Sequence, residues 1–257
     1  MNDTIKYIAS GFLGDFIYQL SVVNENYLTT GKKGVIFLAD KSFSPNMEGW
    51  KFGIEQAYDD LRNIISAQNY IEEFKIYNKE WFYSYINLSK WRQNSLLFKM
   101  DFSDLCKNEY NVNWGEHIWL TLPINKKYSD NIFISSVDTP RLNPLFNYNS
   151  LKKYNKDIYF ISNSKGEYEN FCEVTGCNFE LIFFDTLYEY WSAINSCYLF
   201  VSSFGSFLCA AHAMHKNNIA LLPYSNADIM VKKDFINTYW FKNYNECNLP
   251  DILKIGK

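Results

Sequence analysis

Short apolar runs and stretches of helical spacing alternate along the N-terminal part of the chain. Residues 4–10 and 34–40 are apolar runs of strand length. Between them, apolar residues from Phe16 to Tyr27 recur every three or four positions, and Gly31 follows as a helix stop signal. A strand, a helix and a second strand within about 40 residues predict a βαβ unit and therefore a parallel sheet.

The same alternation becomes regular from Asn131 onward. Apolar runs of strand length are separated there by stretches with the spacing of helices. The expected strands are residues 131–136, 157–162, 179–184, 198–202 and 218–222, and the expected helices between them are 167–175, 187–194 and 204–215. This order predicts a second doubly wound α/β unit.

The two runs of alternation divide the chain into two domains. The polar stretch 123–130, which starts with a proline, is the expected hinge. We therefore expect an α/β protein with two Rossmann-like doubly wound domains that face a cleft, residues 1–128 and 129–257. Residues 81–113 are rich in aromatic residues and Asn without a regular period, so they receive no assignment. Their rings either fill a core or line a binding cleft.

Composition and charge narrow the classes of partner. The 257 residues carry a formal net charge of −3, whereas nucleic-acid binding needs a concentrated basic face, so no nucleic acid is expected as a partner. No apolar run is long enough for a transmembrane segment, although peripheral contact with a membrane stays open. The N-terminus lacks a secretory signal and the cysteines are scattered without a Cys-x-x-Cys motif, so we expect a cytoplasmic protein with reduced thiols.

A glycine-containing turn after the first strand is the first candidate site, because ligands of open parallel sheets bind beyond the carboxyl ends of the strands. It reads Gly11-Phe12-Leu13-Gly14-Asp15 and opens a helix. Gly11 and Gly14 let the backbone approach a ligand, and a helix N-terminus favours polar or anionic groups. Asp15 is either a simple helix cap or a group that does chemistry.

Two turns in the C-terminal half carry cations. Arg141 lies beside a proline after the strand at 131–136, where its guanidinium can meet a phosphate or be solvated as an ordinary surface group. Ser162 and Lys165 belong to the next turn between a strand and a helix. This turn either contacts a nucleotide or is only a loop before a capped helix.

A third turn of the C-terminal half, residues 201–207, is rich in small residues. Ser203, Gly205 and Ser206 provide hydroxyls and accessible backbone N–H groups, which suits a diphosphate. His212 lies on the following helix and is either a ligand contact or a satisfied core histidine. With three histidines and no metal-ligand spacing, no metal site is expected, and the first turn lacks the Gly-x-Gly-x-x-Gly dinucleotide motif.

These turns resemble those of heptosyltransferase-type glycosyltransferases of family 9. The first match is Gly11-Phe12-Leu13-Gly14-Asp15-Phe16-Ile17-Tyr18-Gln19-Leu20, which is similar to the family's opening Gly-Asp motif. The second is the strand, small-residue turn, Ala-rich helix and strand from Val201 to Leu222. The stretch from Asp138 to Arg141 also sits where the family places a loop that contacts the sugar nucleotide.

The resemblance implies a GT-B fold and an inverting, metal-independent transfer of sugar from a nucleoside-diphosphate sugar to a glycan or glycoconjugate acceptor, with no further cofactor. It implies that Asp15 is the catalytic base and that Gly11 and Gly14 lie at the acceptor. The implied donor contacts are Arg141, Ser162, Lys165, Ser203, Gly205, Ser206 and His212.

Two other functions stay open. The acidic residue that the family carries before Thr-Gly in its C-terminal turn is missing, and Ser203-Phe204-Gly205 stands near that place. This difference motivates a non-catalytic nucleotide- or glycan-binding protein on the same fold. A nucleotide-sugar epimerase is a further alternative, and it would act on the free nucleotide sugar without any acceptor.

Overall fold

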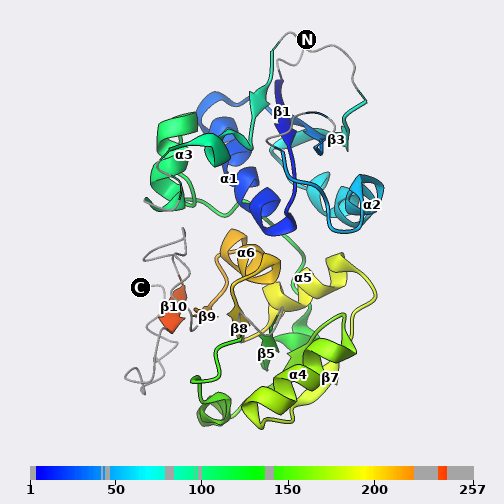
Figure 1. Cartoon of the computed structure of the whole chain (residues 1–257), viewed down its shortest axis with the longest axis vertical. Helices are drawn as coiled ribbons and strands as arrows, with labels where there is room; N and C mark the ends of the chain where they lie inside the picture. The colour runs from blue at the N-terminus through cyan, green and yellow to red at the C-terminus, as the bar shows by residue number, and fades with distance from the viewer. Residues whose placement is uncertain are drawn as a thin grey trace. The chain divides into compact units, whose positions relative to one another are not determined.

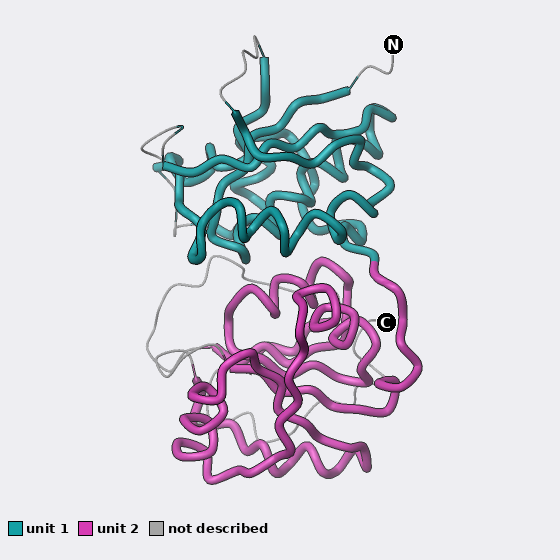
Figure 2. The backbone as a smooth tube through the Cα atoms, turned by 90° about the vertical axis from the view of Figure 1, so that its right-hand side faces the viewer, with its two compact units in different colours: residues 1–121, 229–233 teal, residues 122–228, 234–257 magenta. Residues whose placement is uncertain are grey.

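The computed structural model describes residues 4–41, 43, 47–78, 84–95, 97, 100–136, 142–222 and 237–241. The chain forms two compact units, which divide between Thr121 and Leu122 (Figure 2). This division falls just before the predicted hinge at 123–130. Each unit has its own sheet of parallel strands, so the predicted α/β class is confirmed.

The described part of unit 1 contains a four-stranded parallel sheet with the order β3-β2-β1-β4. Figure 1 labels β1 and β3 of this sheet. Its strands are β1 (Ile5–Ala9), β2 (Gly34–Leu38), β3 (Ile71–Ile76) and β4 (Ile86–Asn87). Its helices are α1 (Leu13–Thr30), α2 (Ile54–Ile65), the 3-10 helix η1 (Lys90–Gln93) and α3 (Phe102–Tyr110). The order of β1, α1 and β2 confirms the predicted βαβ unit.

Helix α1 packs on the sheet through the apolar positions that predicted it. Phe16, Leu20 and Val23 are fully buried, and burial of each such side chain stabilises the fold by about 1.5–3 kcal/mol. The helix ends at Gly31, whose φ of 70° lies in the left-handed region that glycine reaches without strain. Local sequence and core packing therefore agree on where α1 begins and ends.

The described part of unit 2 contains a six-stranded parallel sheet with the order β10-β9-β8-β5-β6-β7. The strands are β5 (Asn131–Ser135), β6 (Asp157–Ile161), β7 (Glu180–Ile182), β8 (Leu199–Ser203), β9 (Asn218–Leu221) and β10 (Thr238–Phe241). The helices are α4 (Lys165–Thr175), α5 (Leu187–Ser196), α6 (Ser206–Ala213) and the 3-10 helices η2 (Lys126–Tyr128) and η4 (Tyr148–Tyr154). Counted from β5, this is the 3-2-1-4-5-6 order of a Rossmann fold.

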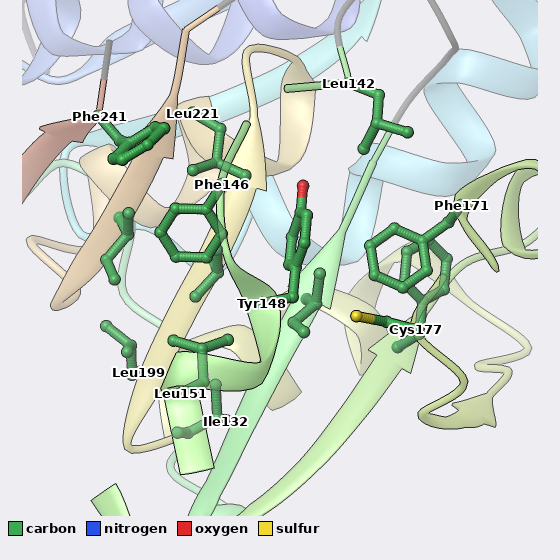
Figure 3. Close-up of a cluster of buried hydrophobic side chains, with 14 residues drawn as sticks. Ile132, Leu142, Phe146, Tyr148, Leu151, Phe171, Cys177, Leu199, Leu221 and Phe241 are labelled. Atoms are coloured by element: carbon green, nitrogen blue, oxygen red, sulfur yellow. The ribbon is translucent and has the colours of Figure 1, made fainter. Parts of the chain in front are cut away.

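Aromatic rings fill the cores of both units. In unit 2, Tyr148 meets Phe146 and Phe171 edge to face at 4.9 Å between centroids, beside aliphatic residues of β5 and β8 (Figure 3). In unit 1, Trp114 and Trp119 are buried. These two tryptophans directly follow the aromatic-rich residues 81–113, and Trp91 and Phe102 within that range are buried as well. Their burial favours a role as core residues.

The strand order places a topological switch point in each unit. In unit 1 the chain runs outward from β1 through β2 to β3 and then returns to β4 on the other side of β1. In unit 2 the corresponding switch lies between β5 and β8. Ligands of open α/β sheets bind beyond the carboxyl ends of the strands at such points, so a ligand site is expected among the residues after β1, β4, β5 and β8.

Two further expectations concern thiols and the membrane. Within the described residues, Cys106, Cys172, Cys177, Cys197 and Cys209 are free thiols. No helix in this part of the chain has both the length and the apolar character that crossing a bilayer requires.

Candidate functional site

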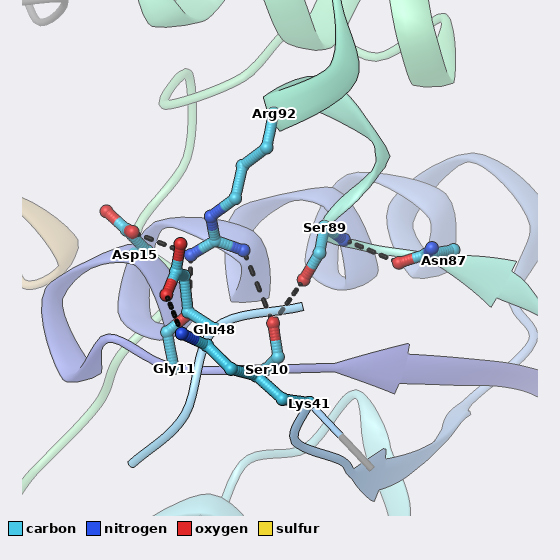
Figure 4. Close-up of polar contacts among 8 residues, drawn as sticks. All are labelled: Ser10, Gly11, Asp15, Lys41, Glu48, Asn87, Ser89 and Arg92. Carbon is cyan, nitrogen blue, oxygen red and sulfur yellow. Dashed lines mark hydrogen bonds and ion pairs between the residues drawn. The ribbon is translucent and has the colours of Figure 1, made fainter. Parts of the chain in front are cut away.

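Two serines meet at the switch point of unit 1. Ser10 follows β1 directly and Ser89 lies just beyond β4, and their hydroxyl oxygens are 2.8 Å apart (Figure 4). The backbone N–H of Ser89 donates to Oδ1 of Asn87 at 2.9 Å. These contacts join the carboxyl ends of two strands that are far apart in sequence.

Arg92 extends from η1 to the same edge of the sheet. Its Nη2 donates to Oδ2 of Asp15 at 2.6 Å and to the carbonyl oxygen of Gly11, and its Nη1 donates to Oγ of Ser10 at 3.3 Å (Figure 4). The guanidinium lies 4.7 Å from the ring centroid of Trp91. The side chain of Arg92 is only 11% exposed, so it is a built part of this site and not a mobile surface cation.

Asp15 lies in the first turn of α1, whose N-cap residue is Phe12. Its side chain is 31% exposed and shares Oδ2 with Arg92. Burial raises the pKa of Asp15, the charge and hydrogen bond of Arg92 lower it, and the charge of Glu48 raises it further. The net shift is upward. A carboxylate of this kind is more basic than a free one and still partly exposed. Asp15 is not the N-cap residue of α1, and its role in chemistry stays a prediction.

Gly11 and Gly14 frame this carboxylate in different ways. A Cβ built on Gly11 would lie 2.2 Å from the carbonyl oxygen of Gly49, so the absence of a side chain is required by the protein's own backbone. Gly11 also bridges to Glu48, which forms a 3.7 Å ion pair with Lys41. Gly14 belongs to the first turn of α1. Contact of either glycine with an acceptor stays a prediction.

Gln19 lies one helical turn beyond Asp15 on the same face of α1. Its side chain is buried, and neither its amide oxygen nor its amide nitrogen has a hydrogen-bond partner in the residues that the structure describes. An unsatisfied buried amide is costly, because its hydrogen bonds to water are lost without replacement.

The switch point of unit 2, where the sequence predicts contacts with a diphosphate, is rich in small polar residues. Ser135 of β5 pairs in register with Ser202 of β8. The hydroxyl of Ser136 is buried and has no hydrogen-bond partner within the described residues. Helix α6 starts at Ser206 after Gly205, an N-cap residue that has no side chain to cap the first turn. The backbone N–H groups at this end suit an anion.

The other predicted donor contacts differ in burial and in hydrogen bonding: Ser203, Arg141, Ser162 and Lys165. Ser203 is buried at the end of β8, and Arg141 lies outside the described residues. Ser162 is buried, donates to Glu167 and accepts from the N–H of Ser164. The side chain of Lys165 is 77% exposed and lies 3.3 Å from Glu169. The contacts of Ser162 belong to the start of α4. Contact of Ser162 or Lys165 with a nucleotide stays a prediction.

His212 is fully buried within α6. Burial lowers its pKa to about 3, the nearby His215 lowers it too, and a hydrogen bond with Asn218 acts in the opposite direction. Its ring lies 5.6 Å from that of Trp240. A neutral, enclosed ring favours the interpretation as a core histidine over the predicted contact with the donor.

The sequence did not point to Arg92 or Glu48. The signal for Arg92 is weak, because β4 and η1 are too short to show a period. One cluster among the described residues has metal-ligating groups, Glu25, Glu116 and His117, with donor atoms within 4.8 Å of one another. Nδ1 of His117 is already 3.0 Å from the carboxylate of Glu25. An ion is therefore not needed to hold these two side chains together.

Comparison with known proteins was made by sequence and by fold. No family model and no curated protein matches the sequence. The E. coli heptosyltransferase WaaC, solved with ADP-2-deoxy-2-fluoro heptose, matches with a TM-score of 0.54 and 11% identity over 98% of this chain and 96% of that chain. A family 9 glycosyl transferase from Veillonella parvula matches with a TM-score of 0.61 and 11% identity over 95% and 88% of the two chains.

A third solved structure, the dodecameric iron-containing heptosyltransferase TibC in complex with ADP-D-beta-D-heptose, matches with a TM-score of 0.61 and 10% identity, over 93% of this chain and 63% of that chain. At such identities the likeness concerns the fold. It confirms, at that level, the resemblance to heptosyltransferase-type glycosyltransferases. The chain therefore has the GT-B type of fold, with two Rossmann-like units that each carry a parallel sheet.

Proposed function

We propose that the protein is a glycosyltransferase that moves a sugar from a nucleoside-diphosphate sugar to a hydroxyl group of a glycan or glycoconjugate acceptor. The observation that carries this proposal is the partly exposed carboxylate of Asp15 at the switch point of a Rossmann-like unit, held there by Arg92. Support comes from the fold, because similar structures were solved with ADP, ADP-heptose or its fluorinated analogue.

In the proposed reaction, Asp15 acts as the general base. It accepts the proton of the acceptor hydroxyl while that oxygen forms a bond to the anomeric carbon of the donor sugar. The bond from this carbon to the diphosphate oxygen breaks, and the electron pair leaves with the nucleoside diphosphate. Attack from the opposite side inverts the configuration. The raised pKa of Asp15 suits this role, because it makes an ionised carboxylate a stronger base near neutral pH.

We assign the donor diphosphate to the switch point of unit 2. The buried hydroxyl of Ser136 lacks a protein partner, and the uncapped start of α6 at Gly205 and Ser206 offers backbone N–H groups. Hydrogen bonds from these groups would stabilise the charge that develops on the leaving diphosphate. Arg141 and Lys165 are the proposed cations, and no metal ion takes part in the proposed reaction.

The test compares Asp15→Asn with Asp59→Asn, a change of an exposed carboxylate on α2. Purified variants are incubated with a panel of nucleoside-diphosphate sugars and glycan acceptors, and release of the nucleoside diphosphate is followed with and without acceptor. We expect Asp15→Asn to lower acceptor-dependent transfer by about 10²–10⁴-fold, with donor binding retained by calorimetry. Asp59→Asn should match the wild type.

Each other outcome has a defined meaning. Wild-type transfer by Asp15→Asn would remove Asp15 from the role of base. If the wild-type protein binds nucleotide sugars but turns none of them over, it is a binding protein and the proposal fails. Conversion of a free nucleotide sugar into its epimer without acceptor would replace the proposal with an epimerase.

A further inference from the structure

We propose that Arg92 is a positioning residue for Asp15, which holds one carboxylate oxygen and leaves the other to take the proton of the substrate hydroxyl. The inference rests on the proposed function for the identity of the reaction. The paired geometry itself is independent of which sugar is moved. It is carried by the contacts at the carboxyl ends of β1 and β4 (Figure 4).

The guanidinium of Arg92 is fixed against the end of β1 as well as against Asp15. Nη2 donates both to Oδ2 of Asp15 and to the carbonyl oxygen of Gly11, and Nη1 donates to Ser10. A planar guanidinium that meets three acceptors has one orientation, unlike the flexible ammonium of a lysine. Through Arg92, the orientation of the Asp15 carboxylate is therefore fixed relative to the backbone at the end of β1.

The other side of this network is tied to β4 and α3. The Ser89 hydroxyl contacts that of Ser10. Tyr110 of α3 donates its hydroxyl to the carbonyl oxygen of Asn87 at 3.1 Å, and the backbone N–H of Trp91 donates to the same hydroxyl at 3.4 Å. Helix η1, which carries Arg92, is thus anchored at both neighbouring elements, and the position of Arg92 does not depend on Asp15 alone.

Arg92 also acts on the pKa of Asp15, together with the other charges around this carboxylate. Glu48 acts on the carboxylate from the segment after β2 and raises its pKa, and Lys41 forms an ion pair with Glu48. Burial acts in the same direction as Glu48, whereas Arg92 lowers the pKa. Without Arg92, burial and Glu48 would favour the neutral form of Asp15, opposed by the hydrogen bond with the backbone of Phe12. A protonated carboxyl cannot act as a base.

The first experiment measures this effect without reference to glycosyl transfer. The carboxyl ¹³C signal of Asp15, assigned by its loss in Asp15→Asn, is titrated by NMR in the wild type and in Arg92→Met, Arg92→Lys and Arg62→Met. Arg62 is an exposed arginine on α2 and serves as the matched control. We expect Arg92→Met to raise the pKa of Asp15 by about one unit or more. Arg92→Lys should shift it less, and Arg62→Met not at all.

The second experiment asks whether this arrangement serves the reaction. In Arg92→Met we expect kcat to fall at least tenfold with the KM for the donor unchanged. The acid limb of kcat/KM should move to higher pH together with the NMR titration. Arg92→Lys should restore the pH profile by its charge but only part of kcat, because an ammonium does not reproduce the three fixed contacts. Circular dichroism and thermal unfolding establish that each variant is folded.

The outcomes separate the two proposals. An unchanged pKa of Asp15 in folded Arg92→Met, or equal losses of kcat in both Arg92 variants with an unmoved pH profile, would overturn the positioning role and leave a structural ion pair. If Arg92→Met does not fold, Arg92→Lys decides by the same two readouts. A wild-type protein that transfers no sugar, but shows the NMR shift, would refute the proposed function and keep the electrostatic pairing.

Discussion

Replacement of Gly11 by alanine tests how tightly the turn after β1 is built. The new Cβ would lie 2.2 Å from the carbonyl oxygen and 3.1 Å from the carbonyl carbon of Gly49. Both are backbone atoms, so no change of rotamer can relieve the overlap. The segment around Gly49, the turn at Gly11, or both must therefore shift.

The size of the effect follows from these contacts. Overpacking of this kind costs about 1–3 kcal/mol. The shift also weakens the hydrogen bond that the carbonyl oxygen of Gly11 accepts from Arg92, and a hydrogen bond to a charged group contributes about 1.5–3 kcal/mol. Because the backbone can relax in part, we expect Gly11→Ala to lower the free energy of unfolding of unit 1 by about 3 kcal/mol.

Gly49→Ala is the matched control, because a Cβ at Gly49 meets no heavy atom within 4 Å. Its free energy of unfolding should stay within about 0.5 kcal/mol of the wild type. The assay is urea unfolding followed by circular dichroism, with hydrogen exchange of peptides from β1 and α1 to report on unit 1 alone. Equal stability and equal exchange of the two variants would refute the close backbone approach at Gly11.

Two further predictions concern buried polar side chains. The pKa of His212 is about 3 in the folded protein, against 6.5 for an unperturbed histidine. Below about pH 6.5 the imidazole of His212 is therefore protonated in the unfolded chain but stays neutral in the folded chain. The free energy of unfolding then falls by up to about 1.4 kcal/mol for each pH unit. Urea unfolding between about pH 6.5 and 5 should show a smaller slope in His212→Leu, and an identical slope would contradict the burial of a neutral ring. Gln19→Met removes an unsatisfied buried amide, so we expect the free energy of unfolding to rise by about 1 kcal/mol; a loss of stability would indicate that the amide has a partner.

Much of the fold can be predicted from the sequence, because buried strands of a parallel sheet are short apolar runs. The runs at 34–40 and 131–136 predict strands that the structure places at Gly34–Leu38 and Asn131–Ser135. The strands β4 and β10 could not be predicted. Strand β4 has two residues, which cannot show a period. Strand β10 pairs with β9 at the edge of the sheet, where long-range pairing decides and local pattern does not.

The residues of the candidate site also divide into those that local sequence predicts and those that depend on long-range pairing. Asp15 could be predicted because it follows a strand and opens a helix, a relation within one short stretch of sequence. Arg92 could not, because its contact with Asp15 depends on the pairing of β1 with β4. For His212 the sequence cannot separate the two interpretations, because a histidine on an Ala-rich helix looks the same whether it faces a ligand or a core. Packing of α6 decides that it is buried.

The pairing of β4 with β1 also determines when the site is assembled. Asp15 and Arg92 are 77 residues apart in sequence, whereas β1, α1 and β2 are consecutive. During synthesis the first βαβ unit leaves the ribosome before Arg92 has been translated. Contacts between distant segments also form slowly, since a long loop must close first. The carboxylate of Asp15 therefore begins as a hydrated charge on a nascent helix, and it loses part of its water only when β4 pairs with β1 and brings Arg92 to it.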